Sequence, residues 1–250
     1  MRVGKLQQIA NFGRRVHFYG RQMLQHRTRA GSLTQLRNWM GLFTDWQRSM
    51  DVAPVAERGP WITYGAISHL ASYIRSDMRI CEYGVGGSTL FYLDRVAQVV
   101  SIEHDAEWAD RLKSILPDAA SGRWTVHITP PQPCSFAKAP DPTDPDAYVS
   151  TLANYANMSF KAYAETIELY PDRSFDAVQV DGRVRHCCVK HAVSKVKPNG
   201  LLILDDSHRE RYADSHKRLE ALGWEKHEYF GPGPYEWGFR TTCIWRRPLP

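Results

Sequence analysis

Residues 81–89 (CEYGVGGST) have the types and spacing best suited to binding a ligand in this chain. Two glycines, Gly84 and Gly86, follow the acidic residue Glu82. Glycines at such a turn adopt backbone dihedral angles that other residues avoid, and their lack of a side chain lets a cofactor approach the backbone. A carboxylate beside the turn disfavours a pyrophosphate and suits a cationic or polyhydroxyl cofactor. The segment therefore predicts a cofactor site of that kind rather than a dinucleotide site.

A second group of acids follows two other apolar segments. Asp181 ends the segment 174–181, and Asp205 and Asp206 follow the apolar run 201–204. Neighbouring strands lie about 4.8 Å apart, so the three carboxylates would converge. Like charges that close need a cation or a proton between them, and carboxylate oxygens are ligands that Mg²⁺ and Ca²⁺ prefer. These residues predict a metal site, with the alternative that they only cap a helix and support a turn.

Without a metal, a general base must remove the proton of an acceptor. His208 is the first candidate because it lies just past the apolar run 201–204, and His186 and Asp181 come next. The chain contains ten histidines, so an ordinary structural or surface role is the competing interpretation for any one of them. The predicted catalytic residues are therefore Asp181, His208 and His186.

Apolar segments alternate with amphipathic ones over most of the chain, and they position these residues. Strands are predicted where short apolar or alternating runs end at a turn or an acid, at 79–83, 98–103, 124–128, 174–181, 201–204, 226–230 and 239–245. Helices are predicted from helical spacing and end signals, at 62–74, in the run 90–93 after the glycine turn, and at 105–116, 184–196 and 209–222. This order implies a mostly parallel sheet covered on both faces, whose ligands bind at the carboxyl ends of the strands.

Residues 130–157 interrupt the alternation. Six of the fifteen prolines lie between positions 130 and 145, with Asp141, Asp144 and Asp146 close by. The segment is too rich in proline for a helix or a central strand. A long loop at the ligand edge is predicted to act as a substrate lid, with an insertion that has no role as the alternative.

With these features, residues 61–247 resemble the class I S-adenosylmethionine-dependent methyltransferases. The resemblance rests on the acidic glycine turn, on the acids that end the second and fourth strands, and on the final pair of strands (Glu82, Gly84, Gly86, Glu103, Asp181 and the last two predicted strands). It implies an α/β fold with a doubly wound, mostly parallel seven-stranded sheet whose last strand is antiparallel. It also implies S-adenosylmethionine as the cofactor. The family usually has glycine where this chain has Ser88.

The resemblance assigns roles around the turn. Glu82 would face the ammonium group of the methionine end, while Ser88 and Thr89 would donate hydrogen bonds to its carboxylate. Glu103 lies 19 residues after Gly84, where a carboxylate binds both ribose hydroxyls, as it also does in dinucleotide enzymes. The predicted cofactor site comprises Glu82, Gly84, Gly86, Ser88, Thr89, Glu103, His104 and Asp181.

The three aspartates are similar to the metal ligands of catechol-type and macrolide-sugar O-methyltransferases. In those enzymes a divalent metal binds adjacent hydroxyls of the acceptor and lowers the hydroxyl pKa. The catechol type has Asp-Asn where this chain has Asp205 and Asp206. The resemblance thus implies Mg²⁺ held by Asp181, Asp205 and Asp206.

The first 50 residues differ in composition from the rest. They carry nine Lys and Arg residues and one acid, a net charge of +8, whereas the remaining 200 residues carry −3. Apolar residues recur at helical spacing on both sides of positions 31 and 32, which predicts a basic helical extension over residues 1–60 before a methyltransferase domain at 61–250. Three interpretations stay open: a cap on the body or on a partner subunit, a face on an anionic membrane, and an organelle transit segment.

The expected activity is methyl transfer from S-adenosylmethionine to an oxygen of a small molecule or glycan, with or without Mg²⁺. Five cysteines without CxxC spacing indicate reduced thiols and a cytoplasmic location, with a peripheral membrane contact through residues 1–50 as an extension. The competing classes are a nucleic-acid methyltransferase, an aminopropyltransferase on the same fold, and a membrane-associated partner protein that binds the cofactor without catalysis. A nucleic-acid partner is disfavoured because the body is not basic.

Overall fold

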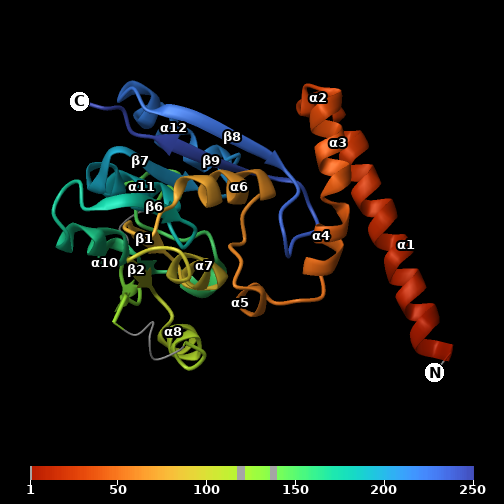
Figure 1. The fold of residues 1–250 in the computed structure, drawn as a ribbon. Helices are drawn as coiled ribbons and strands as arrows, with labels where there is room; N and C mark the ends of the chain where they lie inside the picture. The colour runs from red at the N-terminus through yellow and green to blue at the C-terminus, as the bar shows by residue number, and fades with distance from the viewer. Residues whose placement is uncertain (1, 117–121, 136–139) are drawn as a thin grey trace.

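The short apolar segments pair into one seven-stranded sheet (Figure 1). A computed structural model describes residues 2–116, 122–135 and 140–250. The strands are Arg79–Tyr83 (β1), Gln98–Glu103 (β2), Trp124–Ile128 (β3), Phe175–Val180 (β6), Val196–Leu204 (β7), Glu225–Gly231 (β8) and Arg240–Arg246 (β9). Their order is β3-β2-β1-β6-β7-β9-β8, with β9 antiparallel to both of its neighbours. The predicted mostly parallel sheet with an antiparallel last strand is confirmed, and β8 forms its edge.

The order of the strands reverses between β1 and β6. Both strands run parallel and in register, so that Glu82 lies beside Ser101 of β2 on one side and Gln179 of β6 on the other. From these strands the chain continues into helices α7 (Gly87–Leu93) and α11 (Arg185–Ala192), which pack on opposite faces of the sheet. A ligand crevice is expected at the carboxyl ends of two such strands.

Helices cover both faces of the sheet. Helices α6 (Tyr64–Tyr73) and α7 pack on one face, and α10 (Lys161–Glu165), α11 and α12 (Ala213–Ala221) pack on the other. Helix α8 (Ala106–Lys113) contacts β3. The five helices predicted in the body are present: α7 begins before the predicted run 90–93, and the other four are shorter than predicted. Short 3₁₀ turns lie at Ala153–Tyr155 (η1), Thr166–Leu169 (η2), Val193–Lys195 (η3) and Glu210–Tyr212 (η4).

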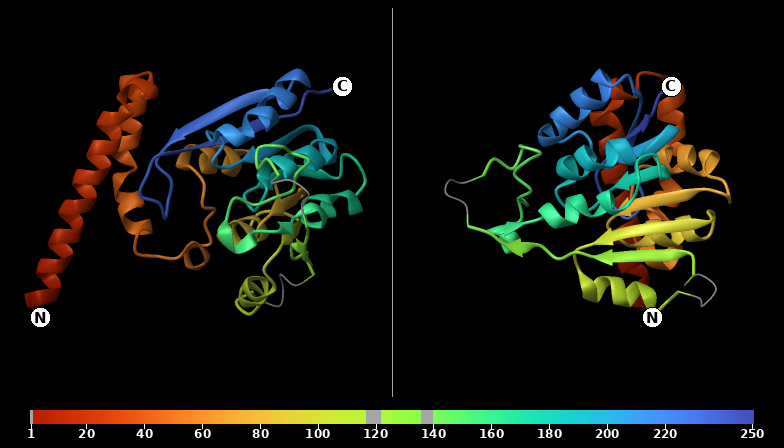
Figure 2. Two further views of the ribbon diagram at one scale, coloured as in Figure 1. Left: turned by 180° about the vertical axis from the view of Figure 1, so that it is seen from behind. Right: turned by 90° about the vertical axis from the view of Figure 1, so that its left-hand side faces the viewer.

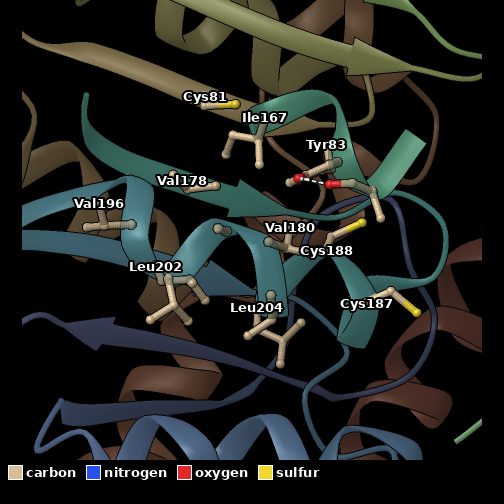
Figure 3. Close-up of a cluster of buried hydrophobic side chains, with 14 of the residues drawn as sticks. Cys81, Tyr83, Ile167, Val178, Val180, Cys187, Cys188, Val196, Leu202 and Leu204 are labelled. Carbon is tan, nitrogen blue, oxygen red and sulfur yellow. Dashed lines mark hydrogen bonds between the residues drawn. The ribbon is translucent and has the colours of Figure 1, made fainter. Parts of the chain in front are cut away.

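Figure 3 shows the core on the α11 face. Cys81, Val178 and Leu202 from three neighbouring strands are fully buried there, because a strand covered on both faces buries alternate residues on each. The hydroxyl of Tyr83 donates to the carbonyl oxygen of Ala164 (2.7 Å). All five cysteines are free and four of them are buried, so they act as small apolar packing residues.

The basic leader forms four helices set to one side of the sheet (Figures 1 and 2). They are α1 (Arg2–Gln25), α2 (Arg27–Ala30), α3 (Leu33–Gly41) and α4 (Phe43–Ser49). The predicted break is present, because Gly31 takes a left-handed conformation (φ 70°) and the Ser32 hydroxyl accepts from the amide of Gln35 (3.1 Å). Buried aromatic side chains of α1, α3 and α4 pack with Phe239 of the body. No helix within the described ranges is long and apolar enough to cross a membrane.

The outer part of α1 keeps three apolar side chains exposed, those of Ile9, Phe12 and Val16. That this face contacts a membrane or a partner subunit stays a prediction.

The proline-rich segment lies at the carboxyl edge of the sheet (Figure 2). A two-residue ladder holds its ends together, between β4 (Gln132–Pro133) and β5 (Met158–Ser159). Inside the segment Tyr148 is buried, and its carbonyl accepts from the amide of Phe160 (2.8 Å). Residues 136–139 lie outside the described residues. The role of a lid stays a prediction.

Candidate functional site

Glu82 is fully buried beneath the glycine turn. Its carboxylate accepts hydrogen bonds from the hydroxyls of Ser88 (2.6 Å), Thr89 (2.5 Å) and Ser101 (2.7 Å), which belong to α7 and β2. Burial raises the pKa of Glu82 to about 7, and the three hydroxyls act in the opposite direction. The carboxylate therefore ties the turn to β2 and α7, with hydroxyls rather than a cation as its partners.

This geometry corrects the roles predicted for Glu82, Ser88 and Thr89. Glu82 and Thr89 are 0% exposed, and both hydroxyls donate to Glu82 instead of standing free for a cofactor. The reason is the alternation of side chains along β1, which directs Glu82 into the space between the sheet and α7. Ser88 still lines the crevice above the turn.

The turn itself requires glycine at two positions. Gly84 has φ +95°, a region that L side chains rarely adopt, and its amide donates to the carbonyl of Ile102 (2.9 Å). A Cβ on Gly87 would lie 2.2 Å from the carbonyl oxygen of Gly59 and 2.6 Å from that of Pro54. The segment that follows the N-terminal helices, including α5 (Pro54–Glu57), therefore closes directly on the turn.

Glu103 ends β2, and backbone amides of two loops surround its carboxylate. His104 (2.6 Å) and Asp105 (2.9 Å) donate to Oε1, while Val85 of the glycine turn donates to Oε2 (2.9 Å). Burial acts to raise the pKa of Glu103, but the His104 side chain and these amides outweigh it and lower the pKa. Oε2 has a single donor, so it retains capacity to accept from a ribose hydroxyl.

Two pockets of about 490 and 310 Å³ lie at the carboxyl ends of the strands. They share the lining residues Gly84, Val85, Trp108, Asp181 and Arg185, so they form one crevice. The larger part is also lined by residues 86–88 of the turn, by residues 53–55 and by Trp61, Glu236 and Arg240. The smaller part is also lined by residues 103–105, Tyr155, Gly182 and Arg183.

Asp181, Asp205 and Asp206 converge as predicted, but a guanidinium group lies among them. Arg185 approaches Asp181 at 2.7 Å, Asp205 at 3.2 Å and Asp206 at 3.4 Å. Arg185 is the first residue of α11, four positions after Asp181. One side chain thus supplies positive charge to all three carboxylates.

Further partners complete the aspartate cluster. Arg209 and Arg240 both form ion pairs with Asp206, the second at 3.2 Å, and the Thr242 hydroxyl donates to Asp205 (2.8 Å). Burial raises the pKa of Asp181 and of Asp205, and the charge of Arg185 opposes that rise. Every carboxylate of the cluster therefore has a guanidinium partner.

The residues present do not fit the predicted Mg²⁺ site. Arg185 holds the position between the aspartates that a metal ion would need, and its hydrogen bonds use the oxygens predicted as ligands. Across residues 2–116, 122–135 and 140–250, no group of three acidic, histidine or cysteine side chains has the arrangement of a metal site. The sequence predicted a cation or a proton between these carboxylates, and the structure places the guanidinium group of Arg185 there.

No protein-family model matches this chain, and no curated protein matches it. Solved structures do. A protein from Corynebacterium glutamicum is 12% identical, with a TM-score of 0.50 over 76% of this chain and 84% of its own. A methyltransferase-like protein from Silicibacter pomeroyi is 23% identical (TM-score 0.47; 75% and 87% covered), and a SAM-dependent O-methyltransferase from Thermotoga maritima is 14% identical (TM-score 0.44; 76% and 68% covered). The mostly parallel seven-stranded sheet with an antiparallel last strand is the fold that the resemblance to class I methyltransferases implied.

Within this fold, the three predicted catalytic residues lie in different places. Asp181 lines both parts of the crevice. His208 is exposed just beyond β7 and does not line the crevice, while His186 is buried on α11 and lines a separate pocket. The first candidate for a base is therefore not brought to the crevice, because the chain turns away after Asp206. Asp181 is the predicted candidate that lies there.

The sequence did not predict several residues that line the crevice: Trp61, Trp108, Tyr155, Arg183, Arg185, Glu236 and Arg240. The spacing of four residues between Asp181 and Arg185, across a strand-to-helix turn, is a signal that could have found Arg185. Arg240 has no local signal, because it reaches the crevice through the antiparallel pairing of β9 with β7.

Proposed function

We propose that this chain is an enzyme that transfers the methyl group of S-adenosylmethionine to an oxygen of a small molecule or glycan. One observation carries the proposal. The glycine turn, Glu103 and Asp181 come from the ends of β1, β2 and β6, and they line a single crevice where the strand order reverses. A site of this shape matches a nucleoside cofactor that carries a charged tail.

The lining residues fit the two halves of the cofactor. In the smaller part of the crevice, Glu103 would accept from the ribose hydroxyls. The Tyr155 ring, held by a hydrogen bond between its hydroxyl and Nε2 of His104 (2.9 Å), borders the space for the base. In the larger part, the turn would hold the methionine end. Trp108 closes the junction between the parts, since its indole N–H donates to the carbonyl of Val85 (2.8 Å). When bound, the cofactor supplies a methyl group activated by a sulfonium.

Asp181 lies where the two parts of the crevice meet. Its ion pair with Arg185 fixes the carboxylate, and burial raises its pKa toward the range in which a carboxylate accepts a proton. We infer that Asp181 takes the proton of the acceptor hydroxyl. Positioning of the acceptor against Trp61 and Arg240 and the exclusion of water supply the remaining acceleration.

Gly86 allows a direct test of cofactor binding. Its backbone is extended (φ 167°), and an added Cβ would meet no described atom within 4 Å, so Gly86→Val should fold while filling the crevice that Gly86 lines. We expect calorimetry to show S-adenosylhomocysteine binding to the wild type, weakened about tenfold or more in this variant. Gly238→Val, also in open space but outside the crevice, is the matched control. A wild type that does not bind S-adenosylhomocysteine would overturn the proposed function.

The reaction itself is tested with labelled S-adenosylmethionine and a panel of hydroxylated acceptors, with and without EDTA. We expect EDTA to leave the rate unchanged and Asp181→Asn to lower it about a hundredfold. The affinity for S-adenosylhomocysteine should change far less. An Asp181→Asn enzyme that keeps its full rate would remove Asp181 as the base.

The aspartate cluster argues against an aminopropyltransferase. A polyamine substrate needs acidic groups without counter-charges, and Asp181, Asp205 and Asp206 are each paired with a guanidinium.

A further inference from the structure

A pocket of about 280 Å³ lies next to the crevice, between the proline-rich loop, the start of α11 and η4. It shares Gly182, Arg183 and Arg185 with the smaller part of the crevice. A molecule bound in this pocket would therefore reach the place where Asp181 lies.

Positive groups dominate this pocket. Four arginines and one histidine line it, and no aspartate or glutamate does: the basic residues are Arg183, Arg185, His186, Arg209 and Arg211. Arg185 and Arg209 are paired with the aspartate cluster. Arg183 and Arg211 have no carboxylate partner in the part of the chain that the structure describes. Arg211 donates to the Thr151 hydroxyl (2.9 Å), and Arg183 lies over the ring of Tyr155 (5.8 Å).

His186 supplies a second, independent observation. Its side chain is 4% exposed and lines the pocket, and neither ring nitrogen has a hydrogen bond of normal geometry among the described residues. The Asp144 carbonyl and the carboxylates of Asp141 and Asp144 lie near enough to oppose the lowering of the His186 pKa by burial. The Nε atom of Arg211 is likewise buried without a partner. Buried polar atoms are normally hydrogen-bonded, so these nitrogens are available to a ligand that carries acceptor oxygens.

Two residues that line this pocket also begin helix α11. Arg185 and His186 are its first two residues, and the amides of a first helical turn have no acceptor within the helix. The residue before them, Val184, has φ 41° and ψ 46°, a left-handed conformation that is unfavourable for a β-branched side chain. Strain of this kind is retained where the surrounding structure holds a functional loop in place.

We propose that this pocket binds a phosphate group of the methyl acceptor. Guanidinium forks match the oxygens of phosphate, and here donors come from three separate segments: the loop after β6, the first turn of α11, and η4. A tetrahedral group with oxygens in several directions uses such donors more fully than a planar carboxylate. The methyl acceptor is then a phosphorylated small molecule or sugar. The acceptor role rests on the proposed function, whereas phosphate binding by the pocket does not.

Calorimetric titration with inorganic phosphate, at ionic strength held constant with sodium chloride, tests the pocket. We expect saturable binding to the wild type and about tenfold weaker binding to Arg211→Met, because a charge-assisted donor is lost. His186→Phe, which keeps an aromatic ring but removes the two nitrogens, should also weaken phosphate binding. Arg111→Met, which removes an exposed arginine of α8, should leave the affinity for phosphate unchanged. Equal phosphate affinity in the wild type and in Arg211→Met would overturn the proposal, as would equal affinity of the wild type for acetate.

Binding of S-adenosylhomocysteine separates this proposal from the proposed function. Arg211 does not line the cofactor crevice, so Arg211→Met should bind S-adenosylhomocysteine like the wild type. Phosphate binding without S-adenosylhomocysteine binding would keep the phosphate pocket and overturn the methyltransferase function. Binding of S-adenosylhomocysteine without phosphate binding would support the proposed function and overturn the proposed phosphate site. With both present, phosphate should compete with the acceptor and not with the cofactor.

Discussion

Two groups of buried carboxylates lie at the ends of neighbouring strands, and the protein compensates them in different ways. Glu82 on β1 has three hydroxyl partners, and burial raises its pKa to about 7. The aspartates that follow β6 and β7 are instead paired with the guanidinium groups of Arg185, Arg209 and Arg240.

The difference shows that an acid at a strand end does not by itself predict its electrostatic state. Hydroxyls satisfy the hydrogen bonds of a carboxylate but leave its charge uncompensated, so Glu82 titrates near neutral pH. Guanidinium groups satisfy the hydrogen bonds and also compensate the charge, so each aspartate then depends on its arginine.

The largest expected effect tests that dependence. Arg185→Met leaves three carboxylates without their shared cation, and we expect the free energy of unfolding to fall by about 3–5 kcal/mol in urea titrations. Arg111→Met, which removes an exposed pair with Glu107 (3.8 Å), should cost less than about 1 kcal/mol. If the free energy of unfolding falls equally little in both variants, Arg185 does not stabilise the aspartates, and the contrast with Glu82 is wrong.

Glu82→Gln tests the other side of the comparison. The folded pKa of about 7 lies above the ordinary value of 4.5, so the stabilising contribution of Glu82 is complete below pH 4.5 and is lost as pH rises through 7. Unfolding measured at pH 4 and pH 8 should show a pH-dependent loss in the wild type about 3 kcal/mol larger than in Glu82→Gln. Identical pH profiles for the two proteins would show that Glu82 does not titrate in this range.

Ser101→Ala sharpens the role of the hydroxyls. The Ser101 hydroxyl donates to Glu82 (2.7 Å) and lowers the pKa of that carboxyl, so its loss should cost about 1–2 kcal/mol. The cost should be larger at pH 8 than at pH 5, since the hydroxyl stabilises the ionised form. Ser72→Ala, which removes an exposed hydroxyl bonded to a carbonyl, is the control and should show no pH dependence. A pH-independent cost at Ser101 would contradict this account.

The smallest expected effect is that of Mg²⁺. Arg185 lies between the aspartates, so titrating MgCl₂ into the wild type should give no saturable heat, and EDTA should not change the melting temperature. Saturable Mg²⁺ binding that is lost in Asp205→Asn would show that Arg185 leaves room for a metal.

Much of the fold follows from local patterns. The apolar segments at 79–83, 98–103 and 124–128 form strands with the predicted bounds, because short apolar runs that end in turns have few alternatives to a buried strand. The ends of the helices were less predictable, and the helix predicted at 184–196 stops at Ala192. The sequence predicted that Glu82 faces the cofactor, but its carboxylate bonds hydroxyls of α7, because its direction depends on which face of β1 that helix covers.

The order of strands and helices in the sequence was enough to predict that acids and glycines meet at one edge of the sheet, because the carboxyl ends of the parallel strands lie on the same side. What neutralises those acids could be learned only from the folded chain. Arg185 was within reach of local reasoning, but Arg240 and the segment around Pro54 come from opposite ends of the chain. Charge compensation and close packing act through space, and residue spacing does not record which distant segments will meet.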